Sequence, residues 1–185
     1  MKFLVLLATV VVAGCTSSVP TLNQYLLRSD ASSQFAVEKQ SAVVGLGSVV
    51  VASYIDGLGL VQESRSGEVR AARDHQWAEP LRDSLRVFMA QEISADAGQV
   101  IRAYNIGEND WQRRIDLRID QLHGTASGKA RLVAYWQVFD TEERTVISEN
   151  GFSEIQPLSA DGYEALVAAE KALLVRLAAK MAASL

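Results

Sequence analysis

Hydrophobic and charged residues alternate most clearly between residues 115 and 120, where every second residue is apolar and the others are charged. This period of two is typical of a strand with one buried side and one side facing solvent. The glycine-containing segment 123–129 follows, and residues 130–139 are mostly apolar and rich in aromatic side chains. The region therefore predicts an antiparallel hairpin with its turn at 123–129.

The other strand patterns are shorter or almost wholly apolar. Valines and glycines dominate residues 41–56, and Gly45, Gly47 and Asp56 interrupt the stretch, so it is typical of a buried strand and not of a bilayer helix. A second hairpin is predicted over residues 58–72. The remaining predicted strands are 25–28, 100–104 and one more within 145–155.

Two segments have the 3.6-residue period of amphipathic helices. The first begins at Pro80, a residue favoured in a first turn, and ends at Gly98. The second begins at the predicted cap Ser159. Their apolar stripes are Leu81, Leu85, Phe88 and Ile93 in the first helix, and Tyr163, Leu166, Val167, Leu174, Leu177 and Met181 in the second. We expect a two-layer α+β fold, in which both helices pack on one face of a mainly antiparallel sheet of about four to six strands.

The N-terminal segment has a different pattern. Lys2 comes before eleven uninterrupted apolar or small residues, Phe3–Ala13, which is typical of a secretory signal peptide and too short for a comfortable membrane span. The tetrad Val12-Ala13-Gly14-Cys15 resembles the bacterial lipobox, in which the cysteine thiol receives a diacylglyceryl group before cleavage. We therefore expect residues 1–14 to be a lipoprotein signal peptide and Cys15 to become the acylated N-terminus. The alternative is an ordinary signal peptide with a chance cysteine.

The expected mature chain has two parts, a lipidated tether over residues 15–24 and a single periplasmic α+β domain over 25–185. One acyl chain binds a bilayer only marginally, whereas two or three chains hold a protein there lastingly. In Gram-negative lipoproteins an aspartate after the cysteine commonly signals retention in the inner membrane. Thr16 occupies that position here. We therefore expect the protein on the periplasmic face of the outer membrane.

Composition and charge argue against several kinds of site and partner. Cys15 is the only cysteine, which excludes an intramolecular disulfide and any metal site built from several cysteines. The formal net charge of −4 argues against nucleic acid as a partner, because nucleic-acid-binding proteins present a basic face. Apolar residues make up 49% of the chain, which is enough to bury a substantial core.

The sequence has no recognisable catalytic or cofactor motif. His75 and His123 belong to no metal-ligand spacing and are interpreted as surface or turn histidines. Residues 124–130 are one residue short of a phosphate loop and lack its magnesium-binding hydroxyl. Gly45 and Gly47 lack the third glycine of a dinucleotide fingerprint. We therefore expect a protein that is not an enzyme and that uses no cofactor or metal.

Two stretches carry a family resemblance: GLGSVVVASYID at residues 45–56, and QWAEPL at residues 76–81. An apolar strand that runs into a Tyr-Leu-Asp-Arg-Pro-like turn, followed by a hairpin and a Trp-Ala-Glu-Pro-Leu-like helix start, resembles the ABC-type transport auxiliary lipoproteins. That family includes the paraquat-inducible PqiC-like (YmbA-like) lipoproteins. Gly57 and Leu58 stand where arginine and proline are common in the family, so a recognition role for that arginine does not carry over.

The resemblance implies a non-catalytic component of an intermembrane lipid transport system. Relatives work beside an MCE-domain tunnel protein anchored in the inner membrane and beside a multi-pass inner-membrane partner. The resemblance therefore implies that this chain sits under the outer membrane and receives the distal end of the MCE tunnel. It also implies assembly into a homo-oligomeric ring.

The candidate partner interface consists of Tyr54, Ile55, Leu58, Leu60 and Trp77. The first four lie in a glycine-punctuated segment that is suited to presenting apolar side chains to a partner. Two interpretations stay open for these residues, contact with a partner or packing in the domain's own core. Other functions also stay open: regulation of cell-wall synthesis, assembly of another envelope complex, or a lipid carrier with its own cavity.

Overall fold

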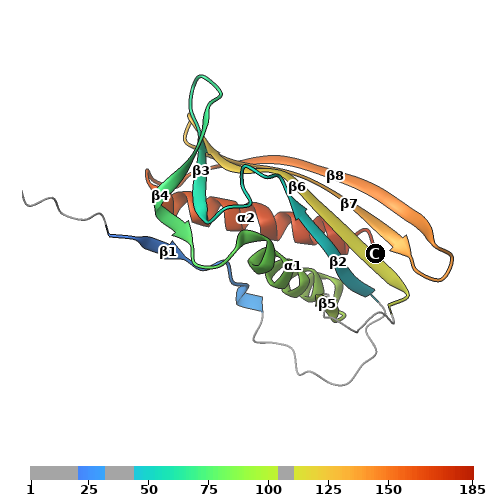
Figure 1. Cartoon of the computed structure of the whole chain (residues 1–185). Helices are drawn as coiled ribbons and strands as arrows, with labels where there is room; N and C mark the ends of the chain where they lie inside the picture. Colours follow the sequence, from blue (N-terminus) through green and yellow to red (C-terminus); the bar gives the residue numbers. More distant parts are fainter. Residues whose placement is uncertain (1–20, 32–43, 104–110) are drawn as a thin grey trace, which may run out of the picture.

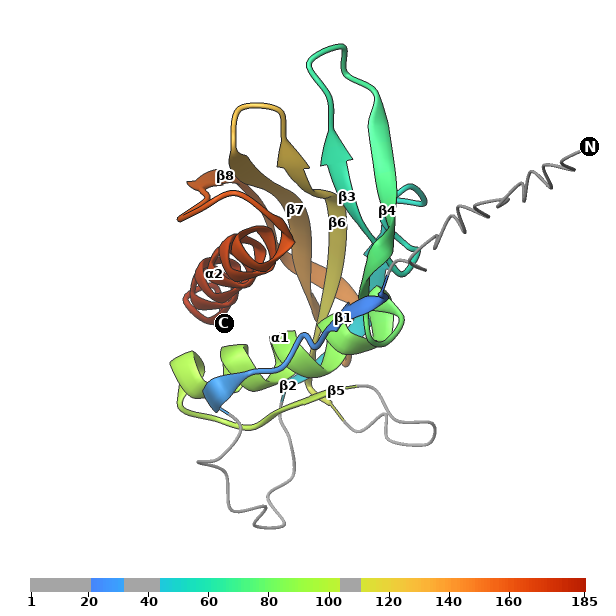
Figure 2. The same cartoon turned by 90° about the vertical axis from the view of Figure 1, so that its left-hand side faces the viewer.

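Strand β6 (Arg113–Thr125) is the centre of the sheet, because three other strands pair with it. The structure is a computed structural model that describes residues 21–31, 44–103 and 111–185. Within these residues it contains eight strands in one mixed sheet and two long helices. Both helices lie on the same side of the sheet, so the described chain has two layers (Figures 1 and 2).

One side of β6 is an antiparallel meander. Strand β7 (Lys129–Asp140) pairs with β6, and β8 (Thr145–Pro157) pairs with β7. The turn between β6 and β7 has Gly128 in the left-handed region, at φ 69°, which glycine adopts without steric cost. The antiparallel hairpin predicted at residues 115–139 is confirmed. Its strands are longer than expected, and β8 fills the whole of the segment 145–155 in which one more strand was predicted.

The other side of β6 is assembled from shorter strands. Strands β2 (Val44–Val51) and β3 (Gly59–Glu63) both run parallel to β6, one after the other along its edge. Strand β4 (Val69–Trp77) forms the predicted hairpin with β3. Two three-residue strands complete the sheet: β1 (Asn23–Tyr25) runs parallel to β4, and β5 (Ile101–Ala103) runs parallel to β2.

The expected sheet of four to six mainly antiparallel strands is wrong. The sheet has eight strands, and four of its seven strand pairings are parallel. The physical reason is that hydrophobic periodicity marks a strand but does not identify its partner. Antiparallel neighbours can be joined by a tight turn, whereas parallel neighbours are brought together from distant parts of the chain.

Helix α1 (Leu81–Ala97) directly follows Pro80, and Gly98 ends it with a left-handed φ of 63°, as predicted. Helix α2 (Tyr163–Ala182) begins later than expected. Ser159 does not cap it; Gly162 stands at the cap position and no side chain hydrogen-bonds to the first turn. The first-turn amides of α2 therefore lack the side-chain cap that the sequence seemed to provide.

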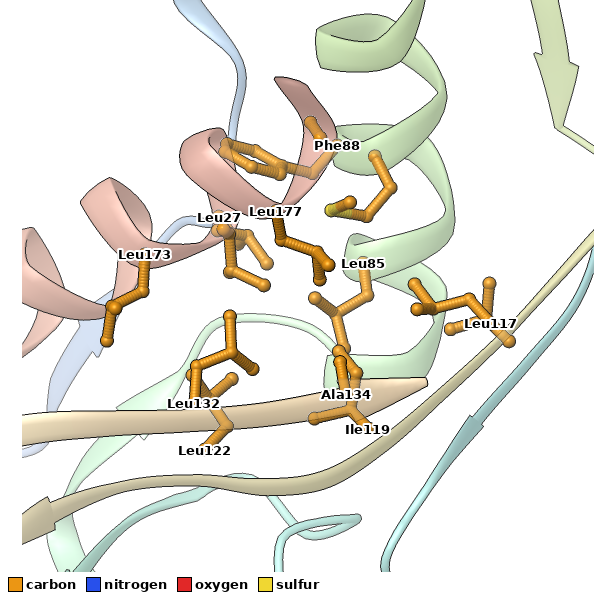
Figure 3. Close-up of a cluster of buried hydrophobic side chains, with 14 of the residues drawn as sticks. Leu27, Leu85, Phe88, Leu117, Ile119, Leu122, Leu132, Ala134, Leu173 and Leu177 are labelled. Carbon is orange, nitrogen blue, oxygen red and sulfur yellow. The ribbon is translucent and has the colours of Figure 1, made fainter. Parts of the chain in front are cut away.

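The core lies between the helices and the sheet, as the close-up in Figure 3 shows. Leu85 of α1 and Leu173 and Leu177 of α2 point toward side chains of β6 and β7, whereas Phe88 of α1 lies beside α2. Burying one such leucine or phenylalanine contributes about 1.5–3 kcal/mol relative to leaving it in water. Almost all of both predicted helix stripes is buried; only Tyr163 is partly exposed.

The predicted signal peptide, Cys15 and the first part of the tether lie outside the described residues. Residues 21–24, assigned to the tether, are described, and Asn23 and Gln24 belong to β1. In the part of the chain that the structure describes, no helix is both long enough and apolar enough to cross a membrane.

Candidate functional site

The loop between β2 and β3, residues 52–58, carries most of the candidate interface predicted from sequence. Because β2 and β3 follow the same edge of β6, the chain must leave the sheet at Ala52 and return at Gly59. The departure is fixed by a hydrogen bond from the Ala52 amide to the Ile119 carbonyl, at 2.9 Å. The return is fixed by the Trp77 amide, which donates to the Leu58 carbonyl at 2.7 Å. The loop is thus held at both ends by backbone hydrogen bonds.

The five predicted interface residues fall into three environments. Ile55, Leu60 and Trp77 are buried and belong to the hydrophobic core. Tyr54 is half-buried and packs against that core. Leu58 is 41% exposed. Of the two interpretations that the sequence left open, core packing describes the three buried residues, and Leu58 is the one presented to solvent.

Tyr54 joins the loop to β6. Its hydroxyl donates a hydrogen bond to the Asp120 carbonyl at 3.3 Å, and its ring contacts the His123 ring edge-on, with 6.0 Å between centroids. Burial, and then the negative charges of Glu63, Asp120 and Glu170, raise the pKa of Tyr54 to about 12. The phenol therefore stays neutral at physiological pH and acts as a structural contact. His123 is buried on β6, and the expectation of a surface or turn histidine is wrong for it.

Two ion pairs border the site. Arg82 in α1 contacts Asp56 in the loop, and Arg28 contacts Glu79, just before α1. The hydrogen-bonded Arg28 guanidinium holds the pKa of Glu79 below its usual value. All four side chains are partly exposed, so screening by water keeps the contribution of each pair to stability small. The Arg82 pair joins the loop to α1, and the Arg28 pair joins the N-terminal segment to the residue before Pro80.

The N-terminal segment runs beside the same end of β4. The Ala78 amide donates to the Tyr25 carbonyl at 2.8 Å, on the opposite side of β4 from Leu58. The Tyr25 hydroxyl and His75 Nδ1 are 3.0 Å apart, and the His75 ring stacks on Tyr163 with 4.1 Å between centroids. These contacts join β1, β4 and the start of α2.

Sequence reasoning missed two exposed leucines in this segment. Leu22 and Leu26 are 50% and 55% exposed, while Leu27 is buried in the core. Neighbouring residues of an extended chain point to opposite sides, so one of the adjacent pair Leu26 and Leu27 had to face solvent. Together with Leu58 they form a set that we call the exposed leucines: Leu22, Leu26 and Leu58.

The acidic residues and histidines of the described part of the chain form no metal cluster, and both histidine rings are engaged within the protein. Within residues 21–31, 44–103 and 111–185, no three His, Cys, Asp or Glu side chains are grouped so that they could hold a metal ion. The ring of His75 is engaged by Tyr25 and Tyr163, and that of His123 by Tyr54 and the Gly124 carbonyl.

Comparison with known proteins gives a consistent result. Residues 25–182 match the family model described as "ABC-type transport auxiliary lipoprotein component". The Intermembrane transport lipoprotein PqiC of Escherichia coli (strain K12) is 25% identical over 137 residues, which cover 73% of this chain and 72% of the relative. The relative from Shigella flexneri, of the same name, matches equally well.

Two solved structures share the fold. One, described as an uncharacterized protein, has a TM-score of 0.74 and 20% identity, and the match covers 89% of this chain and 98% of that one. The other is from Xanthomonas campestris and has a TM-score of 0.64 and 16% identity, with 88% and 90% covered. At these identities they support the fold alone. Since the family model spans nearly all of the described residues, the chain belongs to the ABC-type transport auxiliary lipoprotein family.

Proposed function

We propose that this protein is a lipid-anchored, non-catalytic docking component of an MCE-type intermembrane lipid transport system. The observation that carries the proposal is the family match over residues 25–182, together with the similarity to an intermembrane transport lipoprotein. The anchor is a lipidated Cys15 in the outer membrane, with the domain on the periplasmic face. The partner is the MCE-domain tunnel protein, and the multi-pass inner-membrane protein acts through that partner.

The described structure supports a short connection between anchor and domain. Only five residues lie between Cys15 and Thr21, the first described residue, so the six Cα–Cα steps from Cys15 to Thr21 span at most about 20 Å when fully extended. Leu22 and Leu26 follow directly and are exposed. The domain is thereby held close under the membrane, where the distal end of a tunnel from the inner membrane would arrive. A homo-oligomeric ring of such domains would surround that end.

The exposed leucines are the proposed contact with the MCE protein. An apolar side chain that is half in water gains free energy when a partner covers it, and Leu58 sits on a loop that is already ordered. No large conformational change is then needed to present it.

Site-specific crosslinking in intact cells tests the proposal. A photoreactive amino acid at Leu58 or Leu26 is expected to capture an MCE-domain protein. The same amino acid at Val175, an equally exposed position on α2, is the matched control and is expected to capture much less. Capture of a peptidoglycan synthase from Leu58 instead would support a role in cell-wall synthesis and would contradict the transport role.

The anchor is tested separately. Cys15→Ser is expected to leave an uncleaved precursor that incorporates no palmitate. A Cys15→Ser chain that is still cleaved and labelled would show that the lipobox assignment is wrong, while leaving the fold and the docking surface intact.

A further inference from the structure

Gly45 and Gly47, which fit no nucleotide-binding motif, have a steric role on β2. A β-carbon added at Gly45 would lie 2.0 Å from the Trp111 ring, and one added at Gly47 would lie 2.6 Å from Arg114 Cδ. Real β-carbons do not approach other atoms so closely, so the two glycines let Trp111 and Arg114 lie directly on the strand. Arg114 and Asp116 alternate with the buried Ile115, so they are on the face of the sheet that points away from the core.

Arg114 is held in one orientation by Asp116. Arg114 Nε and Nη2 lie 3.0 and 2.9 Å from the Asp116 carboxylate, and the guanidinium stands over the Phe139 ring at 4.8 Å. The other oxygen of Asp116 accepts hydrogen bonds from the amide and hydroxyl of Ser48, at 2.9 and 3.0 Å. Burial acts to raise the pKa of Asp116, but these hydrogen bonds outweigh it and hold the pKa below its usual value. The acceptor atoms of this carboxylate are therefore committed within the protein.

Arg86 reaches the same place from α1, and its charge is not neutralised. In the described residues it makes no ion pair, and its Nε is fully buried without a hydrogen-bond partner. A buried guanidinium N–H without an acceptor is unfavourable, because on folding it has lost the hydrogen bond that water provided. The Arg86 guanidinium thus has no anionic partner among the described residues, and an anion beside its other nitrogens would neutralise its charge.

Arg86 and Arg114 line one cavity of about 620 Å³, together with Gly47, Ser48, Trp111, Asp116 and Thr141. The formal charge of this lining is two guanidinium groups against one carboxylate. We propose that this cavity binds the phosphate group of a ligand, with Arg86 as the main donor and Arg114 as the second. The proposal goes beyond the docking function, and it would survive if no MCE partner were found.

Phosphate fits the cavity better than the alternative ligand types. A cation would meet the unpaired positive charge of Arg86, and the oxygens of Asp116 are already engaged. An arginine fork presents its N–H groups in the geometry of phosphate or carboxylate oxygens, and phosphate offers more of them. The cavity is also larger than a single phosphate ion needs, so a phosphate ester such as a glycerophospholipid headgroup fits inside.

The test uses the mature lipidated protein in a zwitterionic detergent, with ¹⁵N-labelled arginine. Titration with inorganic phosphate at constant ionic strength is expected to shift the Nε–Hε signals of Arg86 and Arg114, while chloride leaves them unchanged. Arg86→Gln is expected to weaken binding, followed on the Arg114 signal and by calorimetry, by about tenfold or more. Arg86→Lys keeps the charge but loses the fork, and it is expected to weaken binding by a smaller factor.

Arg82→Gln is the matched control, because Arg82 is one turn away on the same helix and already pairs with Asp56. It is expected to bind phosphate like the unchanged protein. A comparison of inorganic phosphate with short-chain phosphatidylglycerol below its micelle concentration identifies the source. Tighter binding of the lipid indicates a headgroup, and equal binding indicates a soluble phosphate. Absence of binding of either probe, or unchanged binding by Arg86→Gln, would overturn the proposal.

Discussion

The two sides of strand β6 are built in different ways. On one side, β7 and β8 follow in sequence order and are joined by short turns, so every pairing is local and antiparallel. On the other side, β2 and β3 share the edge of β6 as parallel partners more than fifty residues away in sequence. Two three-residue strands, β1 and β5, close that side. One side can form from neighbouring residues, whereas the other needs the chain to be brought together first.

This difference should be visible in folding kinetics. Long-range pairings require loop closure before any contact forms, so local hairpins tend to form earlier. The side of β6 with the parallel pairings also carries the loop 52–58 and the cavity lined by Gly47, Arg86 and Arg114. The features that we connect with function thus lie on the side whose formation depends most on the rest of the fold.

The largest expected effect comes from a matched pair of core truncations. Leu46 in β2 and Leu132 in β7 are both completely buried. Each change to alanine is expected to lower the free energy of unfolding by about 4 kcal/mol. Stopped-flow kinetics should separate them: Leu132→Ala mainly slows folding, and Leu46→Ala mainly speeds unfolding. If both changes slowed folding equally, the two sides would form together.

The second prediction has a smaller expected effect and compares one buried polar residue in each helix. The buried Ser94 of α1 is satisfied, since its hydroxyl donates to the Ala90 carbonyl and accepts from the Ile101 amide at 2.8 Å. Glu170 of α2 is only 1% exposed, and its Oε1 has no hydrogen-bond partner. Burial raises the pKa of Glu170 to about 8. The folded protein therefore binds this proton more tightly than the unfolded chain does.

Stability should consequently fall as pH rises. The contribution of Glu170 is fully present below about pH 4.5 and is lost progressively up to about pH 8, with a loss of roughly 3 kcal/mol by pH 7. Glu170→Gln should flatten this pH dependence in urea unfolding measured from pH 4.5 to 8. Ser94→Ala is the control and should lower stability by the same amount at each pH. An unchanged pH slope in Glu170→Gln would contradict the assignment.

The smallest expected effect comes from changing one glycine on each side of β6 to alanine. A β-carbon at Gly59 in β3 would lie 2.4 Å from the Ala72 carbonyl oxygen, a backbone atom that cannot move without disturbing the β3–β4 pairing. At Gly151 in β8 the nearest atom is 3.5 Å away on Tyr135, an ordinary contact. Gly59→Ala is expected to cost about 2 kcal/mol, and Gly151→Ala close to nothing. Thermal unfolding of the two variants measures the difference, and equal melting temperatures would refute it.

The sequence predicted what depends on neighbours along the chain. The alternation at Ile115, Leu117 and Ile119, and the helix limits at Pro80 and Gly98, are local signals, and the corresponding elements are present. The parallel pairings were not predicted, because nothing in the composition of β2 identifies β6 as its partner. Ser159 was a plausible cap, but the chain continues to Gly162 before α2 begins.

For the predicted partner interface, the sequence did not show which of the side chains are exposed. The segment 54–60 does form a defined loop and strand beside Trp77, yet most of its apolar residues turn inward. An apolar residue in a glycine-rich segment has the same sequence signature whether a core or a partner covers it. Gly45 and Gly47 were noticed, but their contact with Trp111 and Arg114 depends on long-range pairing that the sequence does not reveal.

The N-terminal segment has a practical consequence for preparing shortened forms of this protein. Leu27 fills a place in the core, Ser29 reaches Glu92, and the segment passes along α1 (Figure 2). A trimmed chain that starts after residue 31 would leave an apolar hole where Leu27 had been and would uncover one side of the helix. Trimming should therefore stop before Thr21, so that the whole of the described N-terminal segment is kept.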